Sequence, residues 1–202
     1  MDNSINLNLT GLIKTDTYRL YHSPYVVSHQ AVFVEECVYL HNKLTSLYPH
    51  LPLKGREYSL EYTNTNIFSL CSLSVPFYRI FQQITASIRD WVHDDRPLWL
   101  NAWLNYNDND SILDWHHHGS YNILHGYLSI DPKKTVTEFK HFSIKNEVGR
   151  LYIGLAGEKM VHRVVVKEQF EGYRTTLAFN VLDQLPSIQH RNILTISTIP
   201  IP

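Results

Sequence analysis

Three consecutive histidines, His116, His117 and His118, are the residues best suited to chemistry in this sequence. Alternate side chains of an extended strand face the same side, so we expect the rings of His116 and His118 to converge while His117 points away. Two converging neutral imidazole nitrogens form the beginning of a metal site. A solvated surface loop explains the same run equally well, so further residues are needed before the triplet indicates a metal.

His162 and Arg174, further along the chain, support a metal site. His162 lies in an apolar run at 160–166, where a histidine is either a satisfied core residue or a ligand. Arg174 lies in a second apolar run, at 173–182, and a guanidinium in a β core is costly unless it binds an anion. A hairpin near 167–172 would join the two runs and place a dianionic ligand beside the metal. A surface ion pair between Arg174 and a nearby glutamate is the structural alternative.

Taken in order, these stretches resemble the Fe(II)- and 2-oxoglutarate-dependent oxygenases, which have the double-stranded β-helix (jelly-roll) fold. The likeness is greatest to a small bacterial and phage group whose pattern reads Trp-x-Asn, His-x-His, a Gly-Tyr strand, a Gly turn, His and Arg-x-Ser/Thr. The likeness spans 98–182, and the matching stretches lie at 101–105, 116–120, 125–128, 149–153, 162 and 174–176.

The resemblance implies both cofactors and a reaction. Arg174 would bind the distal carboxylate of 2-oxoglutarate, with the hydroxyls of Thr176 and Tyr127 as further donors. The reaction would be hydroxylation of a C–H bond by O2, with 2-oxoglutarate decarboxylated to succinate and CO2, and ascorbate is a candidate reductant. The Fe(II) ligands that the resemblance implies are His116, His118 and His162.

One position departs from the wider superfamily, which mostly has a carboxylate where this chain has His118. An all-histidine face supplies no negative charge, so the metal keeps its full +2 charge. Three arrangements stay open: a true three-histidine site, a site in which only His116 and His162 bind, and a site completed by a carboxylate, for which Asp114 is the nearest candidate.

Aromatic and asparagine residues near the histidines are candidates for a substrate pocket. Such side chains can stack on and orient a bound molecule, although they more often belong to the core or the rim of a fold. A polar loop at 107–110 is placed to cover the site. The candidates are Trp103, Asn105, Trp115 and Tyr121.

The elements that position these residues follow from periodicity. Alternation at 5–13 predicts a strand, and apolar residues at three- and four-residue steps predict helices at about 30–48 and from Ser74 to about 93. From residue 98 the pattern changes to short strands, which favours an antiparallel sandwich or barrel. We expect a mainly β jelly roll with N-terminal helices packed on one sheet. The expected strands are 98–106, 122–130, 135–144, 148–155, 160–167 and 173–182.

We expect one domain, in which residues 1–97 support a β core at 98–182 and residues 183–202 form an extended tail. The chain has 202 residues, of which 44% are hydrophobic and 18% charged, enough for one sizeable core. With 18 basic and 19 acidic residues, the net charge of -1 gives no reason to expect a nucleic-acid or anionic-membrane surface. Cys37 and Cys71 are too few for a disulfide scaffold.

No secretory leader or apolar run of about 20 residues is found, so we expect a cytoplasmic protein without membrane contact. A small molecule or a peptide or protein residue is the favoured substrate, a nucleic acid is disfavoured without being excluded, and the oligomeric state stays open. Two other functions fit the residues: a three-histidine cupin-type dioxygenase without 2-oxoglutarate, and a non-catalytic jelly-roll binding module whose histidines are structural or hold zinc.

Overall fold

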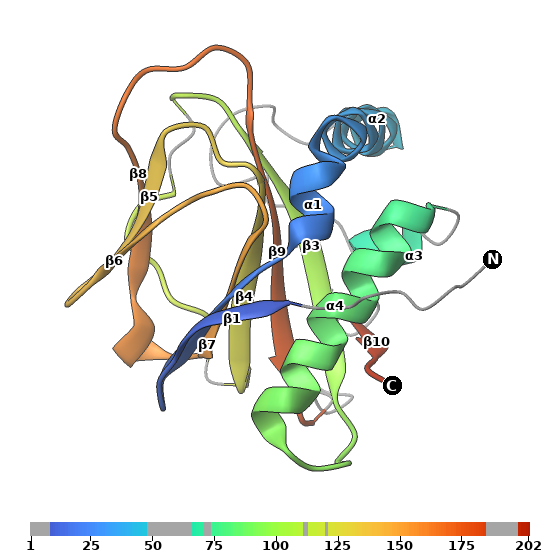
Figure 1. Cartoon of the computed structure of the whole chain (residues 1–202), viewed down its shortest axis with the longest axis vertical. Coiled ribbons are helices and arrows are strands. Elements are labelled where there is room, and N and C mark those ends of the chain that lie inside the picture. Colours follow the sequence, from blue (N-terminus) through green and yellow to red (C-terminus); the bar gives the residue numbers. More distant parts are fainter. Residues whose placement is uncertain (1–8, 48–65, 71–73, 111–112, 120, 185–197) are drawn as a thin grey trace.

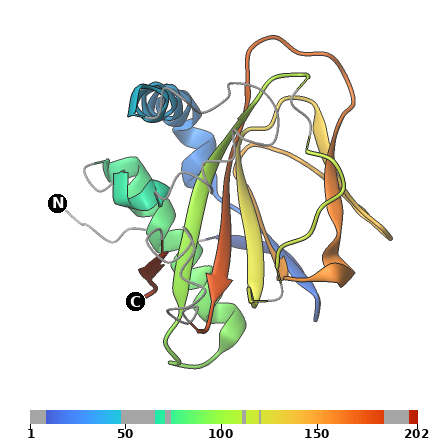
Figure 2. The same cartoon turned by 180° about the vertical axis from the view of Figure 1, so that it is seen from behind.

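The computed structural model describes residues 9–47, 66–70, 74–110, 113–119, 121–184 and 198–202. In this part of the chain, two antiparallel sheets face each other, and the helices lie on the outer side of the larger sheet (Figure 1; Figure 2 shows the same arrangement from behind). The larger sheet has the strand order β1-β2-β7-β4-β9-β3-β10, and the smaller has the order β6-β5-β8. This is the mainly β architecture with flanking helices that the sequence predicts.

The bounds of the elements are as follows. The larger sheet contains β1 (Thr10–Lys14), β2 (Tyr18–His22), β7 (Arg150–Leu155), β4 (Leu124–Asp131), β9 (Arg174–Leu182), β3 (Trp99–Asn107) and β10 (Thr198–Pro200). The smaller sheet contains β6 (Ser143–Lys145), β5 (Thr135–Phe139) and β8 (His162–Val166). The helices are α1 (Pro24–Ser28), α2 (Gln30–Leu47), α3 (Ile67–Leu70) and α4 (Val75–Val92), and a single 3-10 turn spans Glu158–Met160.

Helix α4 shows why the helical predictions succeed. Ser74 caps it by accepting a hydrogen bond from the Phe77 amide, and His93 ends it in the left-handed conformation with φ 57°. The apolar residues between them recur at helical spacing and are fully buried, so the stripe faces the core. These core residues are Phe77, Ile80, Ile84 and Ile88. Helix α2 packs on β3 and β4, and its bounds agree with the predicted helix at 30–48.

Strand β9 divides the core from the space between the sheets. All nine of its residues are buried, yet its side chains alternate in chemistry. Leu177, Phe179 and Val181 belong to the apolar core that the larger sheet shares with the helices. Arg174 and Thr176 fall on the opposite face of the strand, which faces the smaller sheet. The fold therefore buries a polar strip in the interior.

Some elements differ from the sequence-based expectations. The hairpin expected at 167–172 is wrong: β8 pairs with β5, whereas β9 pairs with β3 and β4, so this connection crosses from one sheet to the other. The run expected at 135–144 forms two strands, β5 and β6, and the sequence analysis missed β2 and α1. Residues 5–8 of the expected opening strand, and Cys71, lie outside the described residues.

Residues 185–197 of the expected tail lie outside the described residues, and residues 198–200 pair with β3 as strand β10. Ile201 is buried, and Arg89 of α4 donates to the carbonyl oxygens of Ile201 and Pro202 at 2.9 and 3.0 Å. Among the described helices, none combines the length and the hydropathy needed to cross a bilayer.

Candidate metal centre

Three histidine side chains converge between the two sheets. One ring nitrogen from each of His116, His118 and His162 lies within 4.8 Å of the other two. His162 begins β8, whereas His116 and His118 lie in the irregular segment 113–119. An isolated β-bridge joins the two parts, because the His116 amide donates to the His162 carbonyl at 3.0 Å and the His162 amide donates back at 2.9 Å.

Backbone carbonyls orient two of these rings. Nδ1 of His116 donates to the Asp114 carbonyl at 2.7 Å, and Nδ1 of His162 donates to the Met160 carbonyl at 2.9 Å. A carbonyl oxygen can only accept, so Nδ1 carries the proton and Nε2 carries the lone pair. Metal-ligating histidines are commonly held in this way, with the second nitrogen bonded to the backbone or to a carboxylate.

Burial keeps the rings neutral. Burial, together with the neighbouring His116, lowers the pKa of His162 to about 4, against the opposing hydrogen bond to the Met160 carbonyl. It also lowers the pKa of His118 well below the ordinary value of 6.5, with His162 and His116 adding to the effect and the Asn180 side chain opposing it. At neutral pH both imidazoles therefore have the lone pair that a metal needs, and no proton competes for it.

A fourth histidine, His125 of β4, adjoins the cluster, and the sequence analysis did not single it out as a site residue. It is 2% exposed, and its ring centroid lies 4.4 Å from that of His118 and 5.0 Å from that of His162, nearly parallel to both. Tyr152 Oη lies 3.5 Å from its Nε2, and burial lowers its pKa well below 6.5. The sequence feature that points to His125 is its position two residues before Tyr127, which places both side chains on the same face of a strand.

The cluster lines a cavity of about 290 Å³ between the sheets. Of the substrate-pocket candidates, Trp103, Asn105 and Tyr121 lie in its wall, and Trp103 Nε1 donates to Asn105 Oδ1 at 3.1 Å. Its described lining contains no aspartate or glutamate. The lining residues not named among the candidates are Leu113, His117, Gly119, Asn122, His125, Gly126, Thr137, Val164, Ala178 and Asn180.

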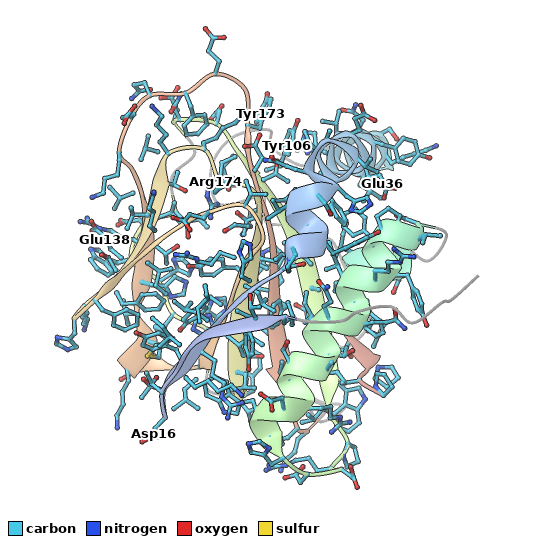
Figure 3. All side chains as sticks on the ribbon, viewed as in Figure 1. Asp16, Glu36, Tyr106, Glu138, Tyr173 and Arg174 are labelled. Atoms are coloured by element: carbon cyan, nitrogen blue, oxygen red, sulfur yellow. The ribbon has the colours of Figure 1, made fainter. Side chains whose placement is uncertain are left out.

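Arg174 places a buried positive charge in the same cavity. It is 4% exposed and begins β9, and Figure 3 shows it between the two sheets. Burial lowers its pKa to about 10, which still leaves it cationic at neutral pH, and no carboxylate among the described residues pairs with it. The surface ion pair considered as the alternative is therefore absent from the described structure. Its Nε lacks a hydrogen-bond partner, as do the buried hydroxyls of Tyr127 and Thr176 in the same wall.

Trp115 and Asp114 lie outside the cavity and the histidine cluster. Trp115 is 40% exposed and does not line the cavity; the Arg163 guanidinium lies 4.8 Å from its ring centroid. The Trp115 side chain therefore lies outside the cavity that Trp103, Asn105 and Tyr121 line, and its role toward a substrate stays a prediction. His117, which was expected to point away from the other two histidines, is itself a lining residue. Asp114 accepts a hydrogen bond from the Trp115 amide and contributes no oxygen to the histidine cluster.

Comparison with known proteins places the fold. No family model and no curated protein sequence matches the chain. The structure resembles a viral collagen prolyl hydroxylase from Paramecium bursaria Chlorella virus 1, with a TM-score of 0.56 at 8% identity over 87% of this chain and 99% of that one. It also resembles apo HygX from Streptomyces hygroscopicus, with a TM-score of 0.54 at 14% identity over 85% of this chain and 83% of that one. The predicted fold is confirmed: the chain has the jelly-roll fold of these solved structures.

Proposed function

We propose that this protein is an Fe(II)- and 2-oxoglutarate-dependent dioxygenase that hydroxylates a C–H bond of its substrate. One observation carries the proposal: a cavity between the two sheets is lined by three converging histidines and by a buried arginine for which the described residues provide no counter-ion. The first feature fits a divalent metal, and the second fits a dianion bound beside it. The solved structure of a viral collagen prolyl hydroxylase shares this fold.

His116, His118 and His162 are the residues that would hold the metal. Three protein ligands on one face leave room for further ligands on the other, which suits non-haem Fe(II). Bound iron would supply the oxidation of a C–H bond by O2, coupled to the conversion of 2-oxoglutarate to succinate and CO2. The protein contributes an enclosed space and neutral, oriented ligands.

Arg174, Thr176 and Tyr127 would hold the distal carboxylate of 2-oxoglutarate. A guanidinium binds a carboxylate through two parallel hydrogen bonds, and the unpartnered Thr176 and Tyr127 hydroxyls are further donors in the same wall. Burial raises the pKa of Tyr127 to about 12, so its hydroxyl keeps its proton and can donate. The anion would satisfy a buried charge that is otherwise uncompensated.

The outer cavity wall would contact the substrate through Trp103, Asn105 and Tyr121. Aromatic faces and amide groups suit a small molecule or a residue of a peptide or protein. The net charge of -1 argues against nucleic acid as the substrate. Ascorbate would serve as the reductant that returns oxidised iron to Fe(II).

A three-histidine cupin-type dioxygenase is the second candidate. The described site has no carboxylate ligand, which favours this alternative. In such an enzyme the substrate itself binds the iron and 2-oxoglutarate has no part. Arg174 discriminates between the two candidates, because a site without 2-oxoglutarate has no need for a buried guanidinium.

The deciding experiment is an anaerobic titration of the metal-free protein with Fe(II) and then with 2-oxoglutarate, followed by the visible metal-to-ligand charge-transfer band. We expect the band in the wild type and at least about thirtyfold weaker 2-oxoglutarate binding in Arg174→Ala, because a buried charge pair is lost. The matched control is Arg96→Ala, which removes an arginine that is half exposed and pairs with Asp94 and Asp183 outside the cavity.

Each other outcome selects a different function. Iron binding without a band in the wild type would support the cupin-type enzyme. Absence of iron binding would leave the non-catalytic binding module. A band that is equally strong in Arg174→Ala would show that this residue does not hold the co-substrate.

A further inference from the structure

The segment that carries two of the three candidate ligands has few backbone attachments. Residues 113–119 form no regular strand, and three backbone hydrogen bonds join them to β8. Two are the reciprocal bonds between His116 and His162, and the third runs from the Val164 amide to the Leu113 carbonyl at 3.0 Å. Something else must restrain this segment if His116 and His162 are to keep the separation that one ion requires.

A side-chain contact lies directly behind these ligands, on the face away from the cavity. Trp115 precedes His116 and Arg163 follows His162, and neither side chain lines the cavity that contains the histidine cluster. The Arg163 guanidinium carbon lies 4.8 Å from the centroid of the Trp115 ring. This cation–π contact therefore joins the ligand segment to β8 one residue from each ligand.

Glu138 of β5 holds the other side of the same guanidinium. Nε and Nη2 of Arg163 donate to Glu138 Oε2 at 3.0 and 2.8 Å, and the two residues are cross-strand partners in the smaller sheet. Lys167 donates to the second oxygen, Oε1, at 3.1 Å. Figure 3 places Glu138 on the outer side of that sheet, away from Arg174.

The planar guanidinium can make both contacts at once, because its face stacks on an aromatic ring while its edge donates to a carboxylate. An ammonium group has no such face and edge. The arrangement links three parts of the chain in series: the ligand segment through Trp115, β8 through Arg163, and β5 through Glu138.

We propose that Arg163, held between Trp115 and Glu138, is a positioning residue that fixes His116 and His162 at the separation needed to bind one metal ion. The inference rests on the proposed metal site. A site whose ligands are already restrained loses less conformational freedom on binding, and residues that act behind the ligands commonly change metal affinity by 10- to 100-fold.

The test is a titration of the metal-free full chain with Co(II), a spectroscopic substitute for Fe(II), that measures both the Kd and the visible spectrum. We expect about tenfold weaker binding in Arg163→Ala and in Trp115→Ala. Arg163→Lys should bind Co(II) more tightly than Arg163→Ala but less tightly than the wild type, because the ammonium can pair with Glu138 but cannot stack on Trp115 in the same way. Trp115→Phe should bind nearly as well as the wild type, because it keeps an aromatic face.

Lys167→Ala is the matched control. It removes the other cation on Glu138 and leaves the contact between Arg163 and Trp115 intact, so its Kd should stay within about twofold of the wild-type value. Urea unfolding of each metal-free variant separates a loss of overall stability from a loss of metal affinity. If Arg163→Ala does not fold, Trp115→Ala and Arg163→Lys carry the comparison, with Trp115→Phe as the variant that keeps the aromatic face.

Two failures are distinguishable. If the wild type binds Co(II) and the Arg163 and Trp115 variants bind it equally well, or if Lys167→Ala weakens binding as much as they do, the positioning role is overturned while the metal site stands. If the wild type does not bind Co(II), the proposed metal site is overturned, and the role of Arg163 with it.

Discussion

The pKa values of His118, His125 and His162 are lowered in the folded chain, and this ties the stability of the metal-free protein to pH. Burial lowers the pKa of His162 to about 4, and it lowers those of His118 and His125 well below 6.5. Between pH 6.5 and 4, the unfolded chain therefore takes up protons that the folded chain does not. Stability is full above pH 6.5 and is lost as the pH falls toward 4.

We expect the free energy of unfolding of the metal-free protein to fall steeply between pH 7 and pH 4.5, as measured by urea unfolding in the presence of a chelator. The shift in the pKa of His162 alone would lower the free energy of unfolding by about 3 kcal/mol once the pH is below 4. His162→Gln should flatten the slope, whereas replacement of the exposed His141 by Gln should leave it unchanged. A slope that is identical in the wild type and in His162→Gln would contradict this account.

At the residue scale, spacing predicted contacts well where the backbone is regular. Arg174 and Thr176 share a face because β9 is a true strand, and period two placed them together. Nearness in the sequence does not predict which side chains line the cavity where the backbone is irregular: in the segment 113–119, His117 lines it and Trp115 does not. His125 could not be assigned, because a lone histidine in an apolar run looks the same whether it packs in the core or adjoins a metal site.

At the scale of elements, β4 must lie very close to its neighbours for the cavity to have its shape. A β-carbon added at Gly126 would lie 2.3 Å from Cζ of Phe179 and 2.4 Å from the Tyr152 carbonyl oxygen. Both contacts are far inside van der Waals distance, and one of them is to backbone that the sheet holds in place. Gly126 therefore permits the close approach of β4 to β7 and β9.

We expect Gly126→Ala to lower the free energy of unfolding by about 3 kcal/mol, because the surrounding core is already filled. The control is Gly172→Ala, which also adds a methyl group. Gly172 has φ 76° but no atom within 4 Å of the added carbon, so only backbone strain of about 1 kcal/mol applies. Urea unfolding measures the free energy of unfolding of both variants. If the two substitutions lower it equally, the strands near Gly126 move apart enough to accommodate the added methyl group.

The sequence predicts the long helices more accurately than it predicts the short elements and the pairing of the strands. Helices α2 and α4 have long periodic stripes, and α4 has a cap at each end, so their bounds followed from local chemistry. The crossing from β8 to β9 could not be predicted, because two strands joined by a short polar segment look like a hairpin until the partner strands are known. Strand β2 and helix α1 are five residues each, too short for a periodic signal.

At the scale of the whole molecule, the proposed ligands would connect the two sheets. His162 belongs to the smaller sheet, whereas Arg174, Thr176 and Tyr127 belong to the larger one. Metal and 2-oxoglutarate bound together would contact both sheets and the segment 113–119. A ligand set that binds only the folded chain stabilises it by mass action.

We expect 2-oxoglutarate, added to the metal-loaded protein at 100 times its Kd, to stabilise the fold by about 2.7 kcal/mol. For a chain of this size that corresponds to a rise in Tm of roughly 5–10 °C, measured by scanning calorimetry. In Arg174→Ala the rise on adding metal should remain, while the further rise on adding the same concentration of 2-oxoglutarate should fall to about a third of the wild-type rise or less. An undiminished second rise in that variant would place the co-substrate elsewhere.

The overall architecture was predictable because short strands with no helices between them restrict the fold to antiparallel sandwiches and barrels. The packing partner of each helix was not predictable. An apolar stripe on α4 shows which face is buried but does not identify the sheet that it covers, since that depends on contacts between residues far apart in the sequence.

The place of Trp103 has a practical consequence. Its indole is 3% exposed, donates to Asn105, and has its ring centroid 6.1 Å from that of His118. A transition-metal ion held by His118 would therefore lie close enough to the Trp103 indole to quench its emission by accepting the excitation energy. Loading of the site can therefore be followed by the intrinsic fluorescence of the unlabelled protein, even while its substrate is unidentified.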